Sequence, residues 1–533
     1  MRKRILVVAI AATCLAVVSI PARTRIVSGR SGSTPQPVGN TVPRGPSIVL
    51  PAEEGARHFL GATPRHLEWV AVPMGSRMVL AFVVSPERSD RAPVLLVTGR
   101  NQGASDWLRA IADQAAAAGF IAVVPDVLTG QGANNGDSDS LHTPHETARA
   151  LAALGPKEIA RRIEAVRAFE VASPASNGIG ARLDFDVQAS TMMAAVETGI
   201  PSHARANFVL SGASFPAAIT FLQRETHDHP ALMPSTSAGE NEHAQHFAML
   251  AQAEKARPEI GQPGADGANT SYAQKRPDLP ADFYTAKATI ENSKLKKEWV
   301  ELQVGDVKMR TWVEYPAGTG KAGTVIVMQH GVGMDTWVRG VADQLAQSGF
   351  IAVAADVWAG IAPNGGGLDA FQYVDDALKA SAKITPDETM RRYKAARDYA
   401  LKLPRSNGKT ASLGFCAGGG NAFRFAGEVP ELNGAVVFYG VPPEEAIMQK
   451  INAPVIGFYG ENDARVTATV EPAAAAMKRM GKSYEPHIYQ KTTHSFVLFQ
   501  EVGGNPAAIN DAWPRVIAFL GVSTCHPVEH QLH

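Results

Sequence analysis

The sequence repeats itself, and this repeat constrains the fold more than any other feature. The segment "DWLRAIADQAAAAGFIAVVPDV" from residue 106 resembles "TWVRGVADQLAQSGFIAVAADV" from residue 336. Five pairs of landmark residues share one offset of 230, namely Trp69 and Trp299, Trp107 and Trp337, Asp126 and Asp356, Arg161 and Arg391, and Asn177 and Asn407. An internal repeat of this length indicates two homologous units. We therefore expect two tandem domains, a first copy over residues 65–290 and a second copy over residues 291–523.

The segments outside the repeat have their own composition. The start, "MRKRILVVAIAATCLAVVSIPAR", has basic residues, an apolar run and a small residue, Ala22, suited to cleavage. This pattern predicts a signal peptide over residues 1–22 and a protein exported to the periplasm or secreted. The alternative is a membrane anchor, but the apolar run is shorter than the ~20 residues of a spanning helix. We expect a flexible lead-in over residues 23–64, rich in Ser, Gly and Pro, and a tail over residues 524–533.

Charge and composition exclude several kinds of partner. The chain has 51 basic and 51 acidic residues, so its formal net charge is zero. Nucleic-acid binding and attachment to an acidic membrane usually need a basic excess, so we expect neither. With 45% apolar residues, the 533-residue chain can build two full cores. A small-molecule substrate fits this composition better.

Short apolar segments alternate with helical stretches in the second copy. The expected strands lie in "TVIVMQH", "GFIAVAAD", "TASLGFC", "GAVVFYG", "PVIGFYGEND" and "PHIYQKTTH", with helices over residues 337–348 and up to about residue 403. Apolar strands separated by helices predict a mostly parallel sheet with helices on both faces, an α/β architecture. Functional side chains are then expected just beyond the carboxyl ends of the strands.

One strand end carries a candidate nucleophile. Gly414-Phe-Cys416-Ala-Gly418 has the form G-x-nucleophile-x-G of a sharp strand-to-helix turn, in which small residues two positions away avoid collision. A thiol at a helix N-terminus has a lowered pKa, and the Ala417 amide there can donate to an oxyanion. The alternative is a buried structural cysteine. Cys525 is the other cysteine outside the signal, and a disulfide between the two would silence this chemistry.

Two later strand ends supply the partners that a nucleophile needs. Asp463 lies in the turn "GEND", and His494 lies in "THSF". Nucleophile, acid and histidine follow one another as they do in the α/β-hydrolase fold. Taken singly, Asp463 could be a turn former and His494 a surface residue. Together the three predict a triad in which His494 is the base and Asp463 orients it.

The second copy resembles the dienelactone hydrolase family. The resemblance is carried by "LPRSNGKTASLGFCAGGGNAF", "VVFYG", "GEND" and "THSF". It implies tandem α/β-hydrolase-like domains and a cysteine esterase or lactonase that needs no cofactor. It also implies that Cys416 attacks an ester or lactone carbonyl, with Ala417 and Gly331 as oxyanion hole. The small-molecule ester or lactone would pass through a thioester.

Some positions depart from the family pattern. His330 stands where well-known members have a glutamate, and it is a substrate contact, a thiol partner or a satisfied polar residue. The arginines that grip a substrate carboxylate in those members have no evident counterpart, because Leu498 follows His494 by one turn and residues 361–390 contain no Arg. Trp358 and Tyr439 are expected at strand ends, where they would line a more apolar pocket or simply pack.

The sharp strand-to-helix turn that carries the nucleophile, the nucleophile elbow, is not preserved in the first copy. At the offset of 230, Cys416 corresponds to Asp186 and Gly414 to Asp184, while Arg100 stands at the place of His330. Glu242 in "GENE" is a faded counterpart of "GEND". No histidine completes a triad in this copy. We expect a catalytically inactive copy that serves packing, substrate gating or partner binding.

Two rival functions and one further site were considered. A non-catalytic binding or scaffold protein is the first rival. A serine-type esterase that uses Ser214 in "LSGASFPAA" is the second, although the repeat places this serine one strand beyond the elbow. The histidines at 227, 229, 243 and 246 and the C-terminal "CHPVEHQLH" have usable spacings, but neither set is completed by carboxylates or cysteines, so we expect no metal site.

Overall fold

The fold is described from a computed structural model of the chain. It describes residues 53–524 except 62, 64, 101, 187–190, 199–205, 212–214, 228–275, 363–364 and 502. The predicted signal, most of the lead-in, the tail after Thr524, Ser214, Glu242 and Cys525 lie outside the described residues. So do three of the four histidines considered for a metal site, while His227 ends a helix. The described residues belong to one compact unit.

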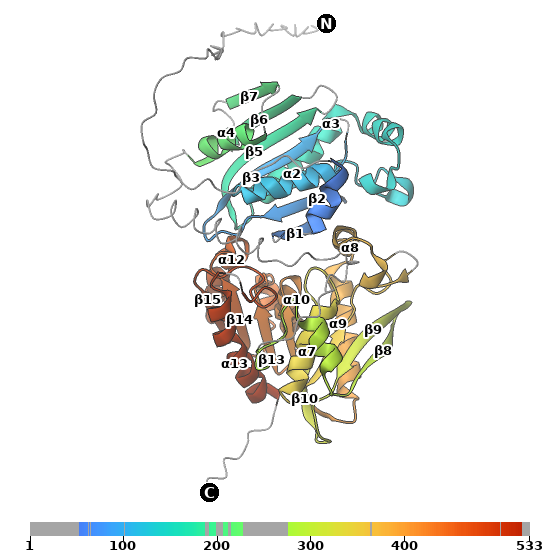
Figure 1. Cartoon of the computed structure of the whole chain (residues 1–533), viewed down its shortest axis with the longest axis vertical. Coiled ribbons are helices and arrows are strands. Elements are labelled where there is room, and N and C mark those ends of the chain that lie inside the picture. Colours follow the sequence, from blue (N-terminus) through green and yellow to red (C-terminus); the bar gives the residue numbers. More distant parts are fainter. Residues whose placement is uncertain are drawn as a thin grey trace, which may run out of the picture. The chain divides into compact units, whose positions relative to one another are not determined.

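The second copy is built on an eight-stranded sheet in the order β15-β14-β13-β12-β10-β11-β9-β8 (Figure 1). Its strands are β8 (Lys297–Val304), β9 (Val307–Glu314), β10 (Ala322–Met328), β11 (Ile351–Ala355), β12 (Ser406–Phe415), β13 (Gly434–Phe438), β14 (Val455–Gly460) and β15 (Tyr484–Tyr489). All pairings from β15 through β11 are parallel, and β9 and β8 are added antiparallel. The predicted mostly parallel sheet is therefore confirmed here.

Helices cover both faces of this sheet. On one face lie α7 (Thr336–Gln347) and α13 (Asn505–Thr524); on the other lie α9 (Pro386–Leu401), α10 (Ala417–Glu428) and α12 (Ala464–Arg479). Successive strand residues point to opposite faces. Val325 and Val327 of β10 accordingly join the core under α7, whereas Ile326 and Met328 join the core under α9 and α10. Continuous apolar runs in the sequence thus reflect strands buried on both sides.

The helical stretch expected up to about residue 403 is divided in two. Helix α8 (Val374–Ser381) ends before α9, which begins at Pro386 with Thr385 as its N-cap. The Thr385 side chain accepts a hydrogen bond from the amide of Glu388. A proline is favourable at the first helical position but interrupts a helix that reaches it from upstream. Two short helices are α11 (Glu445–Met448) in this copy and α6 (Ala286–Asn292), which spans the expected boundary between the copies.

The first copy has a seven-stranded sheet in the order β1-β2-β4-β3-β5-β6-β7. The strands are β1 (His66–Met74), β2 (Arg77–Ser85), β3 (Ala92–Gly99), β4 (Ile121–Pro125), β5 (Ser176–Asp186), β6 (Thr191–Thr198) and β7 (Ala206–Ser211). Here β3 pairs in parallel with β4 and β5, and the other described pairings are antiparallel. A mostly parallel sheet was expected, and the difference arises because β5 turns back into β6 instead of leading into a helix.

Helices of the first copy are α1 (Ala56–Gly61), α2 (Asp106–Ala117), α3 (Pro144–Val171) and α4 (Phe215–His227). Helix α1 corrects the prediction of a patternless lead-in up to residue 64. Ala56 and Leu60 are four residues apart, so they share one helix face, and both are buried. Six residues are too few to show helical periodicity in a sequence. No helix in the described part of the chain combines the length and apolarity needed to cross a membrane.

Buried polar contacts join the first copy to α8 of the second. The indole Nε1 of Trp69 in β1 donates to Asp375 at 2.9 Å, and Arg109 of α2 pairs with the same carboxylate at 2.6 Å. The Lys379 ammonium, which is 3% exposed, lies 3.1 Å from Asp137 of the first copy. Breaking one partner of such a buried pair leaves an uncompensated charge, which is costly. These contacts hold β1 against the second copy. The exact boundary between the copies stays a prediction.

A buried carboxyl pair fixes α7 to the antiparallel edge of the second sheet. Glu314 of β9 accepts from the Trp312 indole at 3.1 Å and lies beside the carboxyl of Asp343 of α7. Both carboxyls are fully buried. Burial, together with the neighbouring Asp343, raises the pKa of Glu314 from its ordinary value of 4.5 to about 9. Glu314 therefore keeps its proton in the folded protein at neutral pH.

We predict that Glu314→Gln removes a pH dependence of stability. A raised carboxyl pKa means that the folded state holds more protons between pH 4.5 and 9, so wild-type stability falls as pH rises through this range. The glutamine keeps the hydrogen bond to the Trp312 indole without titrating. Urea unfolding should show the variant gaining about 1–3 kcal/mol on wild type between pH 5 and pH 8. Glu301→Gln, at an exposed position of β8, is the control; parallel pH profiles for wild type and Glu314→Gln would contradict the prediction.

Candidate active site

Cys416 lies in the strained turn between β12 and α10. Its backbone has φ of 53° and ψ of −120°, a conformation that non-glycine residues rarely adopt. The amide of Cys416 donates to the Phe438 carbonyl of β13 at 3.0 Å, which ties the turn to the neighbouring strand. Strain of this kind persists only where surrounding structure enforces it, and it is concentrated at functional sites. The turn places the thiol beyond the carboxyl end of β12, as the sequence predicts for a nucleophile.

The glycines around Cys416 are required by close backbone contacts. A Cβ on Gly414 would collide with the carbonyl of Gly418, and a Cβ on Gly418 would collide with the carbonyls of Met328 and Gln329. A Cβ on Gly419 would strike the carbonyl of Phe438. Rigid backbone cannot move aside for these atoms, so the glycines allow the helix to begin directly against β10 and β13.

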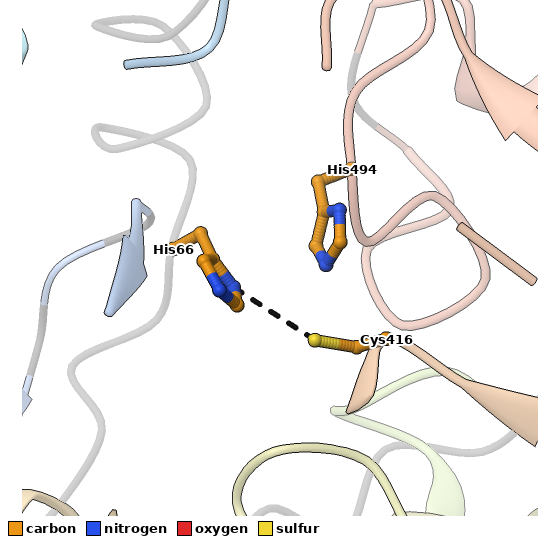
Figure 2. A group of neighbouring side chains, drawn as sticks. All are labelled: His66, Cys416 and His494. Atoms are coloured by element: carbon orange, nitrogen blue, oxygen red, sulfur yellow. Dashed lines mark hydrogen bonds between the residues drawn. The ribbon is translucent and has the colours of Figure 1, made fainter. Parts of the chain in front are cut away.

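His494 and Asp463 come together beyond the ends of β15 and β14. Asp463 is the N-cap residue of α12, and His494 lies in the loop after β15. Nδ1 of His494 lies 2.5 Å from Oδ2 of Asp463, and both side chains are buried. This hydrogen bond fixes the imidazole orientation and leaves Nε2 as its other nitrogen. No hydrogen-bond partner for Nε2 is found among the described residues, and Figure 2 shows this ring directed toward Cys416.

A second histidine, from the first copy, reaches the same thiol. Nδ1 of His66, the first residue of β1, lies 3.8 Å from Sγ of Cys416, and the two imidazole rings are 4.8 Å apart between centroids (Figure 2). Nε2 of His66 lies 3.6 Å from Oε1 of Glu68, which in turn lies 3.8 Å from Arg465 of α12. Cys416 is 8% exposed. The thiol thus lies between one imidazole from each copy.

The electrostatic surroundings favour the charged form of the thiol. Burial opposes ionisation, but the charges of His66 and His494 outweigh it and hold the pKa of Cys416 well below 9. Burial also opposes protonation of His494, but Asp463 and Cys416 raise its pKa to about 10. Burial and the charge of Arg465 oppose protonation of His66, but Cys416 and Glu68 outweigh them and raise its pKa. A thiolate beside imidazolium is the form of cysteine that reacts as a nucleophile.

The two expected oxyanion donors lie beside the thiol. Ala417 is the first residue of α10, so its amide belongs to the N–H groups that a helix leaves without an internal acceptor. Gly331 follows β10, and a Cβ built there would lie 3.7 Å from Sγ of Cys416. The structure brings both residues to the nucleophile; their role as oxyanion hole stays a prediction.

The three expected substrate contacts differ in their surroundings. Nε2 of His330 lies 3.0 Å from Oδ2 of Asp335, the N-cap of α7, and the ring packs edge-on against Trp337. Of the alternatives for His330, these contacts favour a satisfied polar residue. Tyr439, with φ of 39°, has its ring 4.8 Å from that of His494. Trp358 is buried, and its ring lies so close to Gly333 that a Cβ on this residue would collide with it. Pocket-lining roles for Trp358 and Tyr439 stay predictions.

The elbow counterpart in the first copy carries an ion pair. Asp186 is the last residue of β5 and lies 3.2 Å from Arg100. Asp184 lies 2.7 Å from Arg182 and is also hydrogen-bonded to Thr98. Beyond Asp186 the chain forms β6, antiparallel to β5, where the second copy has α10. In the described residues that follow Asp186, from Thr191 on, a strand thus stands where a nucleophile elbow would continue into a helix.

Sequence reasoning missed His66, Glu68 and Arg465. A histidine was sought in the first copy only as part of a triad belonging to that copy. His66 instead serves the thiol of the other copy, and its counterpart at the offset of 230 is Lys296. This difference between His66 and Lys296, in a region where the two copies otherwise align, was the one sign in the sequence that His66 has a separate role. The contact between His66 and Cys416 joins residues that are 350 positions apart, so a local sequence pattern could not predict it.

A model of the Dienelactone hydrolase family matches residues 79–181 and 309–523, more than half of the chain. The chain belongs to the dienelactone hydrolase family. The predicted resemblance and the α/β fold class are thereby confirmed, and this family member is an ester or lactone hydrolase.

Relatives of this family cover the length of one copy. The "Putative carboxymethylenebutenolidase" of Saccharolobus solfataricus is 29% identical over 40% of this chain and 93% of its own length. The "Probable 2-oxo-3-(5-oxofuran-2-ylidene)propanoate lactonase" of a Bradyrhizobium species is 26% identical over 43% of this chain and 95% of its own length. The solved "Putative Dienelactone Hydrolase" of Klebsiella pneumoniae is 22% identical, covers 43% of this chain and 99% of its own, and has a TM-score of 0.40.

We predict that Cys416 is alkylated at pH values where ordinary thiols are not. The thiolate is the reacting species, so with a lowered pKa the iodoacetamide rate of Cys416 should fall less steeply from pH 8 to pH 6 than that of a free thiol of pKa about 8.5, which slows by roughly tenfold per unit. Rates are read by mass spectrometry with glutathione in the same tube. His66→Asn, which removes one imidazole charge, should shift the profile to higher pH. A tenfold loss per unit for wild-type Cys416 would refute the prediction.

Proposed function

We propose that the second copy hydrolyses a small ester or lactone through Cys416, His494 and Asp463, by way of a thioester. One observation supports this more than any other: Asp463 orients His494 through a 2.5 Å hydrogen bond, and the free nitrogen of that imidazole faces the elbow thiol. Nucleophile, base and orienting acid in this relation define acyl-transfer sites on unrelated folds.

The first half-reaction forms the thioester. The Cys416 thiolate adds to the substrate carbonyl, and the carbonyl π electrons move to oxygen, giving a tetrahedral oxyanion. Amides of Ala417 and Gly331 are the proposed donors to that oxygen. The oxyanion collapses, the C–O bond to the leaving group breaks, and His494 gives its Nε2 proton to the departing alkoxide. In a lactone this alkoxide stays attached to the acyl group.

The second half-reaction releases the acid. Neutral His494 takes a proton from water at Nε2, and the resulting hydroxide equivalent adds to the thioester carbonyl. Collapse of this second intermediate breaks the C–S bond and restores the thiolate beside imidazolium. The net change is one water consumed and one carboxylic acid and one alcohol formed. The sequence of steps needs no cofactor.

The first copy shapes this site. His66 stands beside the thiol and adds a second positive group that stabilises the thiolate. Cys416 and His494 are only 8% and 4% exposed, which favours a small substrate over a bulky one. The names of the relatives support a cyclic ester as substrate. The N-terminal pattern supports export of this hydrolase to the periplasm or the medium.

We predict that hydrolysis of p-nitrophenyl acetate and of a lactone panel depends on the triad. Cys416→Ala should lower kcat/KM by at least about 10³-fold, because the covalent route is lost. Asp463→Asn should cost about 10²–10⁴-fold, mainly in kcat, because His494 loses its orienting partner.

Two control variants accompany this assay. Cys525→Ala tests the other thiol and should keep wild-type rates. Ser214→Ala tests the serine-esterase rival and should keep them as well. Activity that survives Cys416→Ala but not Ser214→Ala would overturn the proposal in favour of that rival, and a wild-type protein inactive on every substrate would favour a binding protein.

A further inference from the structure

His66, Cys416 and His494 present three metal-ligating atoms to one point. The atoms lie within 4.8 Å of one another, and in the described part of the chain this is the one group of three such residues found together (Figure 2). They come from the start of β1, the β12–α10 turn and the loop after β15. Sulfur with two imidazoles is a ligand set that suits Zn²⁺ and related ions.

One of the three spacings is close to that of a tetrahedral site, and the widest is longer. Zinc binds cysteine sulfur at about 2.3 Å and histidine nitrogen at about 2.0–2.1 Å, which puts the two ligand atoms about 3.6 Å apart in a tetrahedral site. Sγ of Cys416 and Nδ1 of His66 are 3.8 Å apart. A movement of a few tenths of an ångström would bring this pair to the ideal separation, whereas the widest pair of the group, at up to 4.8 Å, has to close by about 1 Å as the ion binds.

Each imidazole has a carboxylate behind it. Asp463 lies 2.5 Å from Nδ1 of His494, and Glu68 lies 3.6 Å from Nε2 of His66. Metal-bound histidines usually give their second nitrogen to such a carboxylate, which fixes the ring and strengthens the ligand. Asp463 is already hydrogen-bonded to His494 in this way, whereas Glu68 has to approach Nε2 of His66 by a few tenths of an ångström to do the same. Nε2 of His494 also points into the cluster without a hydrogen-bond partner in the described structure, on a side chain that is 4% exposed.

We propose that these three residues bind Zn²⁺ or a similar divalent ion, with the fourth position left to water. The thiolate and two neutral imidazoles form the site, so protons that they carry pass to solvent as the ion binds. The site differs from the histidine-rich segments considered in the sequence. Its third ligand belongs to the first copy, which gives that copy a chemical role.

Bound metal would switch off hydrolysis, a consequence that rests on the proposed function. The sulfur lone pair that attacks the carbonyl and the Nε2 lone pair that accepts the proton would both be held by the ion. Removal of the ion restores both. The resting enzyme would therefore be inhibited by Zn²⁺ and restored by a chelator.

The binding test uses the full chain freed of metal by chelation under reducing conditions. Co²⁺ is titrated in, and a thiolate-to-cobalt charge-transfer band with intense tetrahedral d–d bands should rise to one equivalent; Zn²⁺ should abolish them. Cys416→Ala should lose the charge-transfer band. His66→Ala should weaken Zn²⁺ binding by more than about 100-fold, because losing a ligand exceeds the 10–100-fold effect of losing an outer partner.

Matched variants make the test specific. Glu68→Gln, which keeps all ligands, should weaken binding by about 10-fold or more. His487→Ala removes another histidine, paired with Glu485 on β15, and should leave the spectra unchanged. Thermal melts check the fold of each variant, and His66→Gln replaces His66→Ala if the latter unfolds. Absent bands, or bands and affinities unaffected by the Cys416 and His66 variants, would overturn the metal site.

The activity test separates this proposal from the proposed hydrolase mechanism. Zn²⁺ should inhibit wild-type ester hydrolysis at the concentration that fills the spectroscopic site, and inhibition should need more Zn²⁺ in His66→Ala. Binding without inhibition would overturn the role of Cys416 as nucleophile while the metal site stands. Inhibition without the predicted spectra would overturn the metal site while the hydrolase mechanism stands.

Discussion

The site depends on one strained residue. Cys416 has φ of 53°, and the close approach of α10 to β10 and β13 holds it there. Without that approach the backbone would relax, and the thiol would leave the end of β12. The glycines at 414, 418 and 419 make the approach sterically feasible, so a short sequence segment determines where the helix begins, where the thiol points and which amides face it.

Charge on the buried thiol requires compensation from both copies. Burial alone would keep Cys416 neutral, and the imidazoles of His66 and His494 reverse that preference. Each imidazole is in turn supported by a carboxylate, and Arg465 with His66 holds the pKa of Glu68 at about 2 against its burial. A group of alternating charges of this kind is stable only if all members stay in place. The contacts of Trp69 and Arg109 with Asp375 keep β1 in position for it.

Patterns within one copy could be predicted from the sequence, and contacts between copies could not. The parallel sheet of the second copy and the elbow follow from local patterns, namely apolar runs and glycine spacing, and chain order pointed to Asp463 and His494. The pairing of β5 with β6 was missed because the loss of the nucleophile elbow at Asp186 does not show which structure follows β5. His66 was missed because its partner lies 350 residues away, and α1 because six residues show no periodicity.

The two copies have diverged in complementary ways. The first copy lost the elbow, where Asp186 pairs with Arg100, yet its β1 begins with His66, whose counterpart in the second copy is Lys296, just before β8. Glu68 of β1 has the same residue type, Glu298, as its counterpart. A histidine at this place in the second copy would lie at the far edge of its own sheet, seven places from β15, and could not serve its own elbow. In this structure the second imidazole beside Cys416 comes from β1 of the first copy. The first copy thus brings a side chain to the thiol of the second copy, which β8 at the far edge of the second sheet does not do.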